Sequence, residues 1–346
     1  MKILIVKPSS LGDVVQALPV LRLLKKHDPA SQIYWWLAAE LIPLLENDPD
    51  LAGLFPFYRR GWRSPIYWLR LAHTLRQIRT LSFDWVIDLQ SLARSGAISW
   101  LARGSLTVGL DDPREGAEAF YDMAVPRQSY MTHAADWYLD VLRALKVPVN
   151  QDFTWFPHRP NTVADLRKKW DLENSRWVVL HPGARWTNKR WPIEYYAETV
   201  ARLGRTDPEL HFAILGGGGD MELGKAIAQT LPGRCLNLTG QTSLPEMVEW
   251  IRLADLMITN DTGPMHVAAA MRKPLIALFG PTEPHRTGPY HQLENALQHP
   301  LPCVPCMKPQ CANTQPLACL RKITPDTVVA AALQRLHPDA SKDYHL

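Results

Sequence analysis

The chain has no apolar run long enough to span a membrane, and it has few cysteines for its length. Nothing in its 346 residues approaches the roughly 18 consecutive apolar residues of a spanning helix. The apolar run at residues 1–7 is too short for a signal peptide and predicts a first strand instead. Five cysteines, four of them late in the chain, do not form the framework of a secreted disulfide-rich protein. These absences predict a cytoplasmic protein.

The chain also lacks a strong net charge and a dinucleotide-binding fingerprint. With 38 Lys and Arg against 34 Asp and Glu, the net charge is +4, so the composition gives no reason to expect a nucleic-acid partner. The loop after the first predicted strand has no G-x-G-x-x-G pattern, which argues against a dinucleotide site and disfavours an oxidoreductase. The length predicts two domains of about 150 to 180 residues each.

What the chain does have is a repeated alternation of short β-rich runs and helical patterns. The first series contains strands over residues 3–7, 33–37 and 85–89 and a helix over residues 13–26. The second series begins with a strand over residues 177–181. It continues with strands at 211–215, 235–238, 256–259 and 274–279 and with helices at 193–203, 221–230, 244–253 and 264–270. This alternation predicts an α/β fold with parallel sheets and crossover helices.

A polar, proline-bearing stretch at residues 156–162 is the expected hinge between two doubly wound domains. It gives a first domain at residues 1–158 and a second at residues 163–346. Two such domains that face each other place the carboxyl ends of their strands at a shared cleft, where ligands bind. The position of the last helix, over residues 325–336, is left open, with packing back on the N-terminal domain as one option.

The most informative motif is the run Asn-Asp-Thr-Gly-Pro-Met-His at residues 260–266. It follows an apolar strand, and Pro264 stands where the first residue of a helix is expected. Such a turn aims backbone N–H groups and the positive end of a helix dipole at one point, as phosphate sites do. Asp261, Thr262 and His266 crowd the same turn. We therefore expect a phosphorylated ligand in the C-terminal half.

The loop at residues 181–192 follows a predicted strand and suits the same ligand. It contains Gly183 and three cations, of which Lys189 or Arg190 can meet a diphosphate as a point charge. An ordinary connection with surface cations is an equal alternative. Where the last strand ends, Thr282 can complete the phosphate pocket, or the chain simply reverses there.

A four-glycine turn at residues 215–222 offers a close approach of the backbone to a ligand. An acid just beyond such a turn often binds a ribose hydroxyl. Glu222 is the better candidate here, because Asp220 is expected to be the N-cap of the following helix. Glycine-rich turns are common, so this motif alone is only weak evidence for a ligand site.

The loop at residues 8–13 links the first strand to the first helix and carries one acid, Asp13. Asp13 can cap the helix, which is worth about 1 kcal/mol. It can also act as a general base at the floor of the cleft. One carboxylate is sufficient for a direct displacement in which an acceptor hydroxyl loses a proton.

Residues 51–103 are basic and aromatic. They contain eight arginines against two acids, which gives a local charge of 8 − 2 = +6. Aromatic residues of the same stretch include Phe55, Phe57, Tyr58, Trp62, Tyr67, Trp68 and Trp100. Such a surface suits an anionic partner or a layer of membrane headgroups. A solvated face whose aromatic residues belong partly to the core is the alternative.

Four cysteines lie close together in the sequence near the end of the chain. In a reducing compartment they can form a structural tetrathiolate zinc site, although the spacing is not that of a standard zinc ribbon. Reduced thiols and one or two disulfides are the alternatives. The four are Cys303, Cys306, Cys311 and Cys319.

Six of these segments, in this order, resemble the lipopolysaccharide heptosyltransferases of glycosyltransferase family 9, and the resemblance covers nearly the whole chain. The segments are residues 3–14 (I-L-I-V-K-P-S-S-L-G-D-V), 86–91 (V-I-D-L-Q-S), 181–183 (H-P-G), 189–192 (K-R-W-P), 260–266 and 279–284 (F-G-P-T-E-P).

The resemblance implies a GT-B fold, in which two Rossmann-like doubly wound domains flank an interdomain cleft. It also implies an inverting transfer of a heptose from ADP-heptose to a sugar hydroxyl of the nascent inner core of lipopolysaccharide. Neither a metal ion nor a cofactor is required for this transfer. Asp13 would be the general base, and Lys189 would neutralise the departing diphosphate. The implied donor-binding residues are Ser10, Gly12, Glu222, Asp261, Thr262, Gly263 and His266.

The acceptor that the resemblance implies is an acidic glycolipid of the Kdo–lipid A type. It lies at the inner face of a Gram-negative inner membrane, so a peripheral location on that membrane surface is expected. The implied acceptor contacts fall in the basic and aromatic stretch and shortly after it, at Arg60, Arg63, Arg94 and His133.

Other functions remain open at this point. A transferase of the same family with a different donor or acceptor fits the same motifs. A sugar-nucleotide epimerase would need a second set of acid and base groups, which the sequence does not show. A non-catalytic sugar-nucleotide binder is disfavoured because both Asp13 and Lys189 are present.

Overall fold

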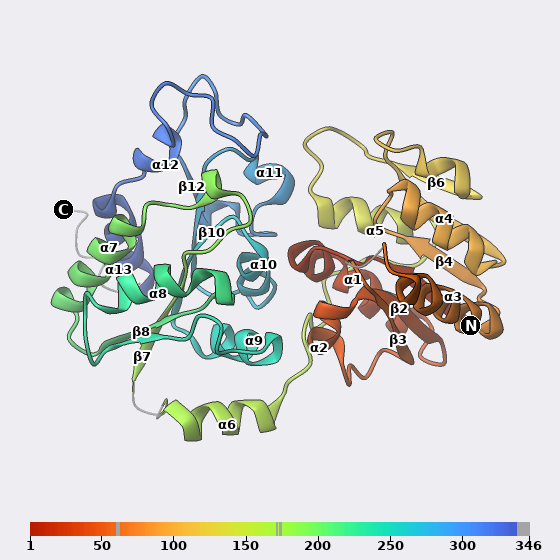
Figure 1. Ribbon diagram of the computed structural model, residues 1–346, viewed down its shortest axis with the longest axis horizontal. Coiled ribbons are helices and arrows are strands. Elements are labelled where there is room, and N and C mark those ends of the chain that lie inside the picture. Colours follow the sequence, from red (N-terminus) through yellow and green to blue (C-terminus); the bar gives the residue numbers. More distant parts are fainter. Residues whose placement is uncertain (60–62, 171, 173–174, 338–346) are drawn as a thin grey trace. The chain divides into compact units, whose positions relative to one another are not determined.

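The structure, a computed structural model, describes residues 1–59, 63–170, 172 and 175–337 (Figure 1). The chain divides into two compact units, Met1–Pro157 and His158–Leu346. Within the described ranges, no helix is long and apolar enough to cross a membrane. The expected hinge runs into a helix, α6 (Pro160–Trp170), because proline suits the first turn of a helix and the cations at residues 167–169 suit the last turn.

The N-terminal unit is built on a parallel sheet of six strands in the order β3-β2-β1-β4-β5-β6. The strands are β1 (Lys2–Val6), β2 (Gln32–Ala38), β3 (Gly53–Phe57), β4 (Trp85–Asp88), β5 (Leu106–Asp111) and β6 (Met123–Pro126). The helices are α1 (Leu11–His27), α2 (Ile42–Leu45), α3 (Pro65–Leu81), α4 (Ala93–Ala102) and α5 (Ala134–Ala144), with 3-10 turns η1 (Ala39–Leu41) and η2 (Ala117–Phe120).

The central strands of this sheet are covered on both faces, which explains their continuous apolar runs. Residues 3–6 of β1 are fully buried. On one face, α1 packs against α5, and on the other α3 packs beside α4 (Figure 1). A cluster that includes Leu4, Trp36, Phe57 and Ile78 fills the space between the sheet and α3.

The C-terminal unit repeats this plan, with six parallel strands in the order β12-β11-β10-β7-β8-β9. The strands are β7 (Arg176–His181), β8 (Leu210–Ile214), β9 (Cys235–Asn237), β10 (Leu256–Asn260), β11 (Leu275–Phe279) and β12 (Ala296–Gln298). The helices are α7 (Ile193–Thr206), α8 (Met221–Ala228), α9 (Leu244–Leu253), α10 (Gly263–Ala270), α11 (Pro284–Thr287), α12 (Ala318–Arg321) and α13 (Pro325–Leu336). The 3-10 turns are η3 (Thr187–Lys189), η4 (Gly218–Asp220) and η5 (Leu293–Asn295).

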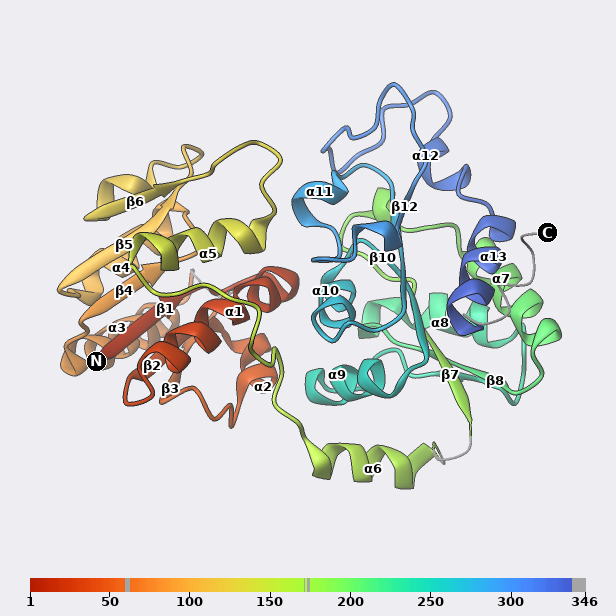
Figure 2. The same ribbon diagram turned by 180° about the vertical axis from the view of Figure 1, so that it is seen from behind.

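The last helix, α13, belongs to the core of the C-terminal unit. It packs against α7 (Figure 2). Its Val328, Ala332 and Leu336 join a buried cluster with Tyr196 and Phe212. The apolar face of this helix is therefore buried within the C-terminal unit.

Both sheets have the strand order of a Rossmann fold. In each, the chain moves outward from the first strand and then returns to place the fourth strand on its other side, so β1 pairs with β4 and β7 pairs with β10. The direction of winding reverses at these pairs, and ligands of such folds bind beyond the carboxyl ends of the strands there. The loops after β1, β4, β7 and β10 therefore hold the residues of interest.

Candidate active site

Three of the sequence motifs meet at one edge of the C-terminal sheet. The parallel strand β10 pairs directly with β7 on one side and with β11 on the other, so the loops that follow these strands are neighbours. The loop after β7 contains Lys189, the turn after β10 contains Asp261, and the turn after β11 contains Thr282.

The carboxylate of Asp261 joins these loops. Its Oδ2 lies 2.6 Å from Nζ of Lys189 and accepts a hydrogen bond from Oγ1 of Thr282 at 2.5 Å. Asp261 and Thr282 are buried, whereas the Lys189 side chain keeps 19% of its surface exposed. Its ammonium also lies 4.9 Å from the centre of the Trp186 ring. A lysine that pairs with a buried acid while part of its surface stays open is well placed to meet an anionic ligand.

Asn260 fixes the loop after β7 to the end of β10. Its Nδ2 donates to the carbonyl of Pro182 at 2.7 Å, and its Oδ1 accepts from the backbone N–H of Trp191 at 3.0 Å and from the hydroxyl of Tyr196 at 3.2 Å. Asn260 belongs to the motif at residues 260–266, but the sequence alone predicted no role for it. An amide side chain directly after a fully buried strand was the available signal, because a buried amide needs partners.

The helix α10 begins at Gly263, one residue before the predicted start. Thr262 stands before it with an extended backbone and makes no side-chain capping bond, and Pro264 occupies the first turn. The positive end of the helix dipole therefore lies next to Asp261 and Lys189. His266, one turn into the helix, is buried.

Asp220 holds two loops together rather than capping α8 with its side chain. It occupies the N-cap position, but its Oδ2 accepts from the N–H of Gly217 at 3.0 Å, and its Oδ1 lies 3.9 Å from the guanidinium of Arg190. A Cβ at Gly183 would lie only 2.5 Å from Asp220 Oδ2, so the loop after β7 needs a glycine there. Glu222 lies in the first turn of α8 and is exposed.

His181 closes β7 at this edge of the sheet. Burial lowers the pKa of His181, although the charge of Asp220 opposes this shift. Its Nδ1 is buried and has no hydrogen-bond partner among the residues that the structure describes. The imidazole is therefore neutral near pH 7.

In the N-terminal unit, Asp13 caps α1 together with Ser10. Oδ2 of Asp13 accepts from the backbone N–H of Ser10 at 2.9 Å and from its hydroxyl at 2.6 Å, an arrangement that forms a capping box. The capping role is thus real, and it holds the carboxylate in one place at the end of β1. Gly12 is buried in the first turn of the same helix.

A buried lysine lies behind this turn. Lys7 donates to the carbonyl of Leu89 at 2.8 Å, and its ammonium lies 4.8 Å from the centre of the Tyr138 ring. Burial alone would lower the pKa of Lys7, but Tyr138, Asp13 and Asp88 together raise it above its usual value. The turn that carries Asp13 is therefore backed by a permanent positive charge.

Asp88 ends β4 beside this lysine. It is fully buried, and it accepts hydrogen bonds from the N–H of Gln90 at 2.8 Å and from the hydroxyl of Tyr121 at 2.8 Å. Burial raises the pKa of Asp88, and these hydrogen bonds limit the rise. Asp88 therefore organises the loop after β4, the second loop at the switch point of this sheet.

The residues expected to contact the acceptor are spread over the N-terminal unit. Arg63 precedes α3, and Arg94 lies in the first turn of α4, 5.9 Å from the centre of the Phe57 ring; both are exposed. His133 is the N-cap of α5, where its Nδ1 accepts from the N–H of Ala135 at 3.1 Å. Arg60 lies outside the described residues.

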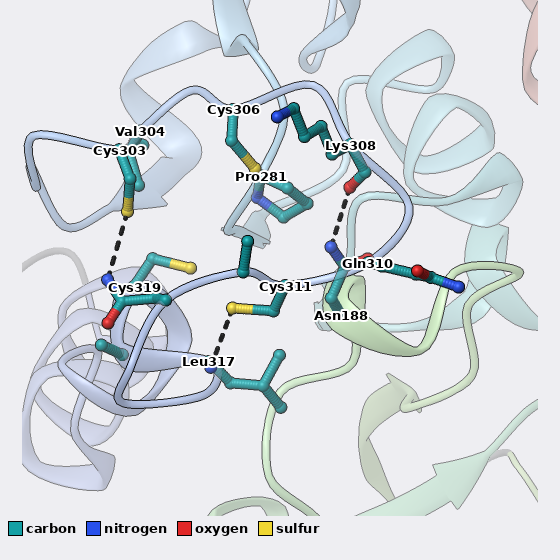
Figure 3. Close-up of a pocket in the computed structure, with 13 residues that line it drawn as sticks. Asn188, Pro281, Cys303, Val304, Cys306, Lys308, Gln310, Cys311, Leu317 and Cys319 are labelled. Carbon is teal, nitrogen blue, oxygen red and sulfur yellow. Dashed lines mark hydrogen bonds between the residues drawn. The ribbon is translucent and has the colours of Figure 1, made fainter.

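The four late cysteines line one cavity of about 190 Å³ in the C-terminal unit (Figure 3). All are free thiols, and within the described part of the chain no group of three or more His, Cys, Asp or Glu is placed to hold a metal ion. Among the described residues the structure thus shows neither the disulfides nor the zinc site that were alternatives for this cluster. Two sulfurs instead accept hydrogen bonds within the loop, Cys303 from Asn313 at 3.4 Å and Cys311 from the N–H of Leu317 at 3.5 Å.

Two doubly wound α/β sheets in one chain, the second with a lysine and a helix N-terminus at its switch point, are the architecture of the GT-B class. A family model described as glycosyltransferase family 9 (heptosyltransferase) matches residues 68–316. The chain therefore belongs to glycosyltransferase family 9, and it is a glycosyltransferase.

Two relatives support this family at similar levels. The chain is 30% identical over 325 residues to lipopolysaccharide heptosyltransferase 1 of Pseudomonas aeruginosa, an alignment that covers 90% of this chain and 87% of that protein. It is 31% identical over 308 residues to lipopolysaccharide heptosyltransferase 2 of Salmonella typhimurium, covering 84% and 85%.

Two solved structures share the fold. A glycosyl transferase of family 9 from Veillonella parvula has a TM-score of 0.82 and 24% identity, and the alignment covers 98% of this chain and 97% of that one. The E. coli heptosyltransferase WaaC with ADP has a TM-score of 0.75 and 22% identity, covering 97% and 100%. The predicted α/β fold of GT-B type is confirmed.

Proposed function

We propose that the protein transfers a heptose from ADP-heptose to a sugar hydroxyl in the inner core of nascent lipopolysaccharide, with inversion at the anomeric carbon. The observation that carries the proposal is the pairing of Lys189 with Asp261 beside the N-terminus of α10. Relatives named lipopolysaccharide heptosyltransferases 1 and 2 support the heptose and the acceptor, and a structural neighbour with bound ADP supports the nucleotide.

The C-terminal unit would hold the donor. Phosphate oxygens accept hydrogen bonds, so they suit Lys189 and the N–H groups at the start of α10. A carboxylate repels phosphate, so Asp261 would instead accept from sugar hydroxyls while it holds Lys189 in position. Thr262, Gly263 and His266 belong to the same turn. Glu222, exposed at the start of α8, would accept from the ribose hydroxyls.

The N-terminal unit would activate the acceptor. The acceptor oxygen attacks the anomeric carbon as the bond from that carbon to the diphosphate oxygen breaks, and the hydroxyl proton passes to Asp13. General-base catalysis of this kind contributes about two to four orders of magnitude. Ser10 fixes the carboxylate through two hydrogen bonds, so the base is held in place before the acceptor arrives.

Negative charge develops on the departing diphosphate as the bond breaks. Lys189 and the α10 terminus would meet this charge, the electrostatic contribution that usually dominates such reactions. Lys189 and the backbone N–H groups of α10 would thus stabilise the charge that a metal ion stabilises in other enzymes. We therefore propose a transfer that needs neither a metal ion nor a cofactor.

The acceptor would be an acidic glycolipid of the Kdo–lipid A type. Such an acceptor has its sugars at the membrane surface, so the enzyme would act as a peripheral protein at the cytoplasmic face of the inner membrane. Arg63 and Arg94 are exposed cations of the N-terminal unit that would meet its negative charges.

Thermal unfolding in the presence of ADP, GDP, UDP and ADP-heptose tests the donor assignment, because a ligand stabilises the state that binds it. We expect ADP and ADP-heptose to raise the unfolding midpoint and the other nucleotides to leave it unchanged. A shift with UDP or GDP and none with ADP would replace the proposal by a family member with a different donor. Release of ADP only when the glycolipid is present would then test the transfer itself.

A further inference from the structure

The outer side of α3 exposes large apolar side chains that the core of the N-terminal unit does not use. Ile66, Trp68 and Leu69 keep 59%, 57% and 69% of their surface exposed. The helix has a normal inner side, on which Thr74 and Ile78 are buried. The apolar residues at the start of α3 are therefore not an extension of the core.

The exposed part of α3 also carries arginines. Arg70, Arg76 and Arg79 are exposed, and within the described residues none of them forms an ion pair with a carboxylate. Seven residues separate Leu69 from Arg76, which places the two on one stripe of the helix. We use the name α3 face for the set Ile66, Trp68, Leu69, Arg70, Arg76 and Arg79.

The neighbouring helix extends the same character. Arg79 donates from Nε to the carbonyl of Leu101 at 2.9 Å, so the end of α3 lies beside the end of α4. Trp100, one residue before that contact, is 63% exposed, and Arg103 follows it at the C-cap. Neither α3 nor α4, which are neighbours in Figure 1, contains an Asp or a Glu in its sequence.

We propose that the α3 face docks on the surface of an anionic lipid bilayer. Arginines without acidic neighbours are attracted to anionic headgroups, and Trp, Leu and Ile beside them can enter the boundary between headgroups and acyl chains. Tryptophan is the side chain best suited to that boundary, because one end of the ring system is apolar and the other carries an N–H.

The same observations disfavour two other occupants. A second copy that presents the same face would bring like charges together, because this face holds cations and no acids. A nucleic acid would use the arginines but would leave Ile66 and Leu69 exposed, since phosphates offer no apolar contact. A bilayer satisfies both the cations and the apolar side chains.

Flotation of the full chain with vesicles tests the proposal. We expect binding to vesicles that contain phosphatidylglycerol and little binding to phosphatidylcholine alone. Added salt should weaken the binding, because the Debye length falls from about 10 Å at 0.1 M to about 3 Å at 1 M. Equal binding to both kinds of vesicle, or binding to neither, would overturn the proposal.

Two pairs of substitutions localise the contact. Arg70→Gln with Arg76→Gln should lower the partition onto anionic vesicles roughly thirtyfold. Trp68→Ser with Leu69→Ser should also lower it, while the salt dependence that remains is unchanged. The matched control is Lys168→Gln with Lys169→Gln on α6, which removes the same charge from exposed positions of the other unit. An equal loss in the control pair, or no loss in the α3 pairs, would overturn the assignment to this face.

The inference rests on the proposed function only in that the acceptor is a membrane glycolipid. Vesicle binding needs neither donor nor acceptor, so the two proposals fail separately. Heptose transfer without vesicle binding would contradict only the proposed docking of the α3 face. Vesicle binding by a protein that transfers no heptose would contradict only the proposed function.

Discussion

Lys189 Nζ lies 2.6 Å from Asp261 Oδ2, although 72 residues separate the two in the sequence. Thr282, in the loop after β11, donates a hydrogen bond to the same oxygen and so holds Asp261 in place. Asp261 in turn holds Lys189, which lies in the loop after β7. An ammonium has three N–H donors, and the contact with Asp261 leaves donor capacity for phosphate oxygens. The pair therefore positions a positive charge before any ligand binds.

Substitution of this lysine tests its proposed role. Lys189→Gln removes the charge that would meet the leaving diphosphate, and we expect kcat/KM for transfer to fall about 10²- to 10³-fold. The affinity for ADP should fall as well, because the diphosphate is present in that ligand. Steady-state kinetics and titration with ADP measure the two effects.

A neighbouring cation provides the control for that experiment. Arg185→Gln removes one positive charge from the same loop at an exposed position. We expect a much smaller effect on kcat/KM, since the position is not joined to the Asp261 cluster. If both variants lose activity to the same extent, the loop acts through its net charge and Lys189 has no special role.

Removal of the proposed base tests the N-terminal unit. Asp13→Asn keeps an oxygen that can accept from the N–H of Ser10 but removes the basic carboxylate. We expect transfer to fall about 10²- to 10⁴-fold and ADP affinity to stay unchanged. Asp13→Ala should show the same loss of transfer. Full turnover by Asp13→Asn would remove Asp13 from the role of base.

The capping box makes a stability control necessary for this position. Loss of a cap costs about 1 kcal/mol whatever its catalytic role. Thr324→Ala removes a cap from α13, where the Thr324 hydroxyl accepts from the N–H of Thr327. A similar drop in the unfolding midpoint with normal transfer in Thr324→Ala would show that lost capping alone does not explain an inactive Asp13 variant.

Much of the C-terminal unit could be predicted from the sequence. Its strands β7, β8, β10 and β11 are short apolar runs with a Gly or Pro within three residues of their ends, and buried parallel strands have this signature. The motif at residues 260–266 also placed α10 to within one residue. The pairing of Lys189 with Asp261 could not be predicted, because it depends on the register of β7 beside β10.

The strands at the edges of the N-terminal sheet were missed for a physical reason. β3 has the sequence Gly-Leu-Phe-Pro-Phe, and β6 has Met-Ala-Val-Pro. Both contain proline, which has no backbone N–H to donate and is therefore tolerated at the edge of a sheet, where no further strand needs that donor. The helix α3 was missed as well. Its outer side carries apolar residues beside the arginines, so the sequence lacks a clear helical period of apolar and polar positions and was described only as basic and aromatic.

The acceptor assignment is open to a separate test. Arg63→Ala with Arg94→Ala removes two exposed cations of the N-terminal unit. We expect the KM for the acidic acceptor to rise about tenfold or more for each lost contact, because a charged hydrogen bond to an anion is worth about 1.5–3 kcal/mol. The affinity for ADP should not change. Arg143→Ala on α5 is the matched cation control. An unchanged KM in the double variant would show that these arginines do not bind the acceptor and belong to an ordinary solvated surface.

The last prediction concerns acid stability and His181. Its folded-state pKa lies below the usual value of about 6.5 because of burial, so above that pH both folded and unfolded states carry a neutral ring. As the pH falls below about 6.5, the unfolded state takes up a proton that the folded state resists, and stability is lost. His181→Gln should therefore lose less stability than the wild type as the pH falls from about 7.5 to about 5.5.

Thermal unfolding of the C-terminal unit within the full chain measures this difference as a smaller fall of the unfolding midpoint in the variant. His211→Gln, in the neighbouring strand β8, controls for the loss of an imidazole from the same unit. A wild-type pH dependence in His181→Gln would contradict the prediction. The buried Nδ1 gives the physical reason to expect otherwise, because a proton added there would have no acceptor among the described residues.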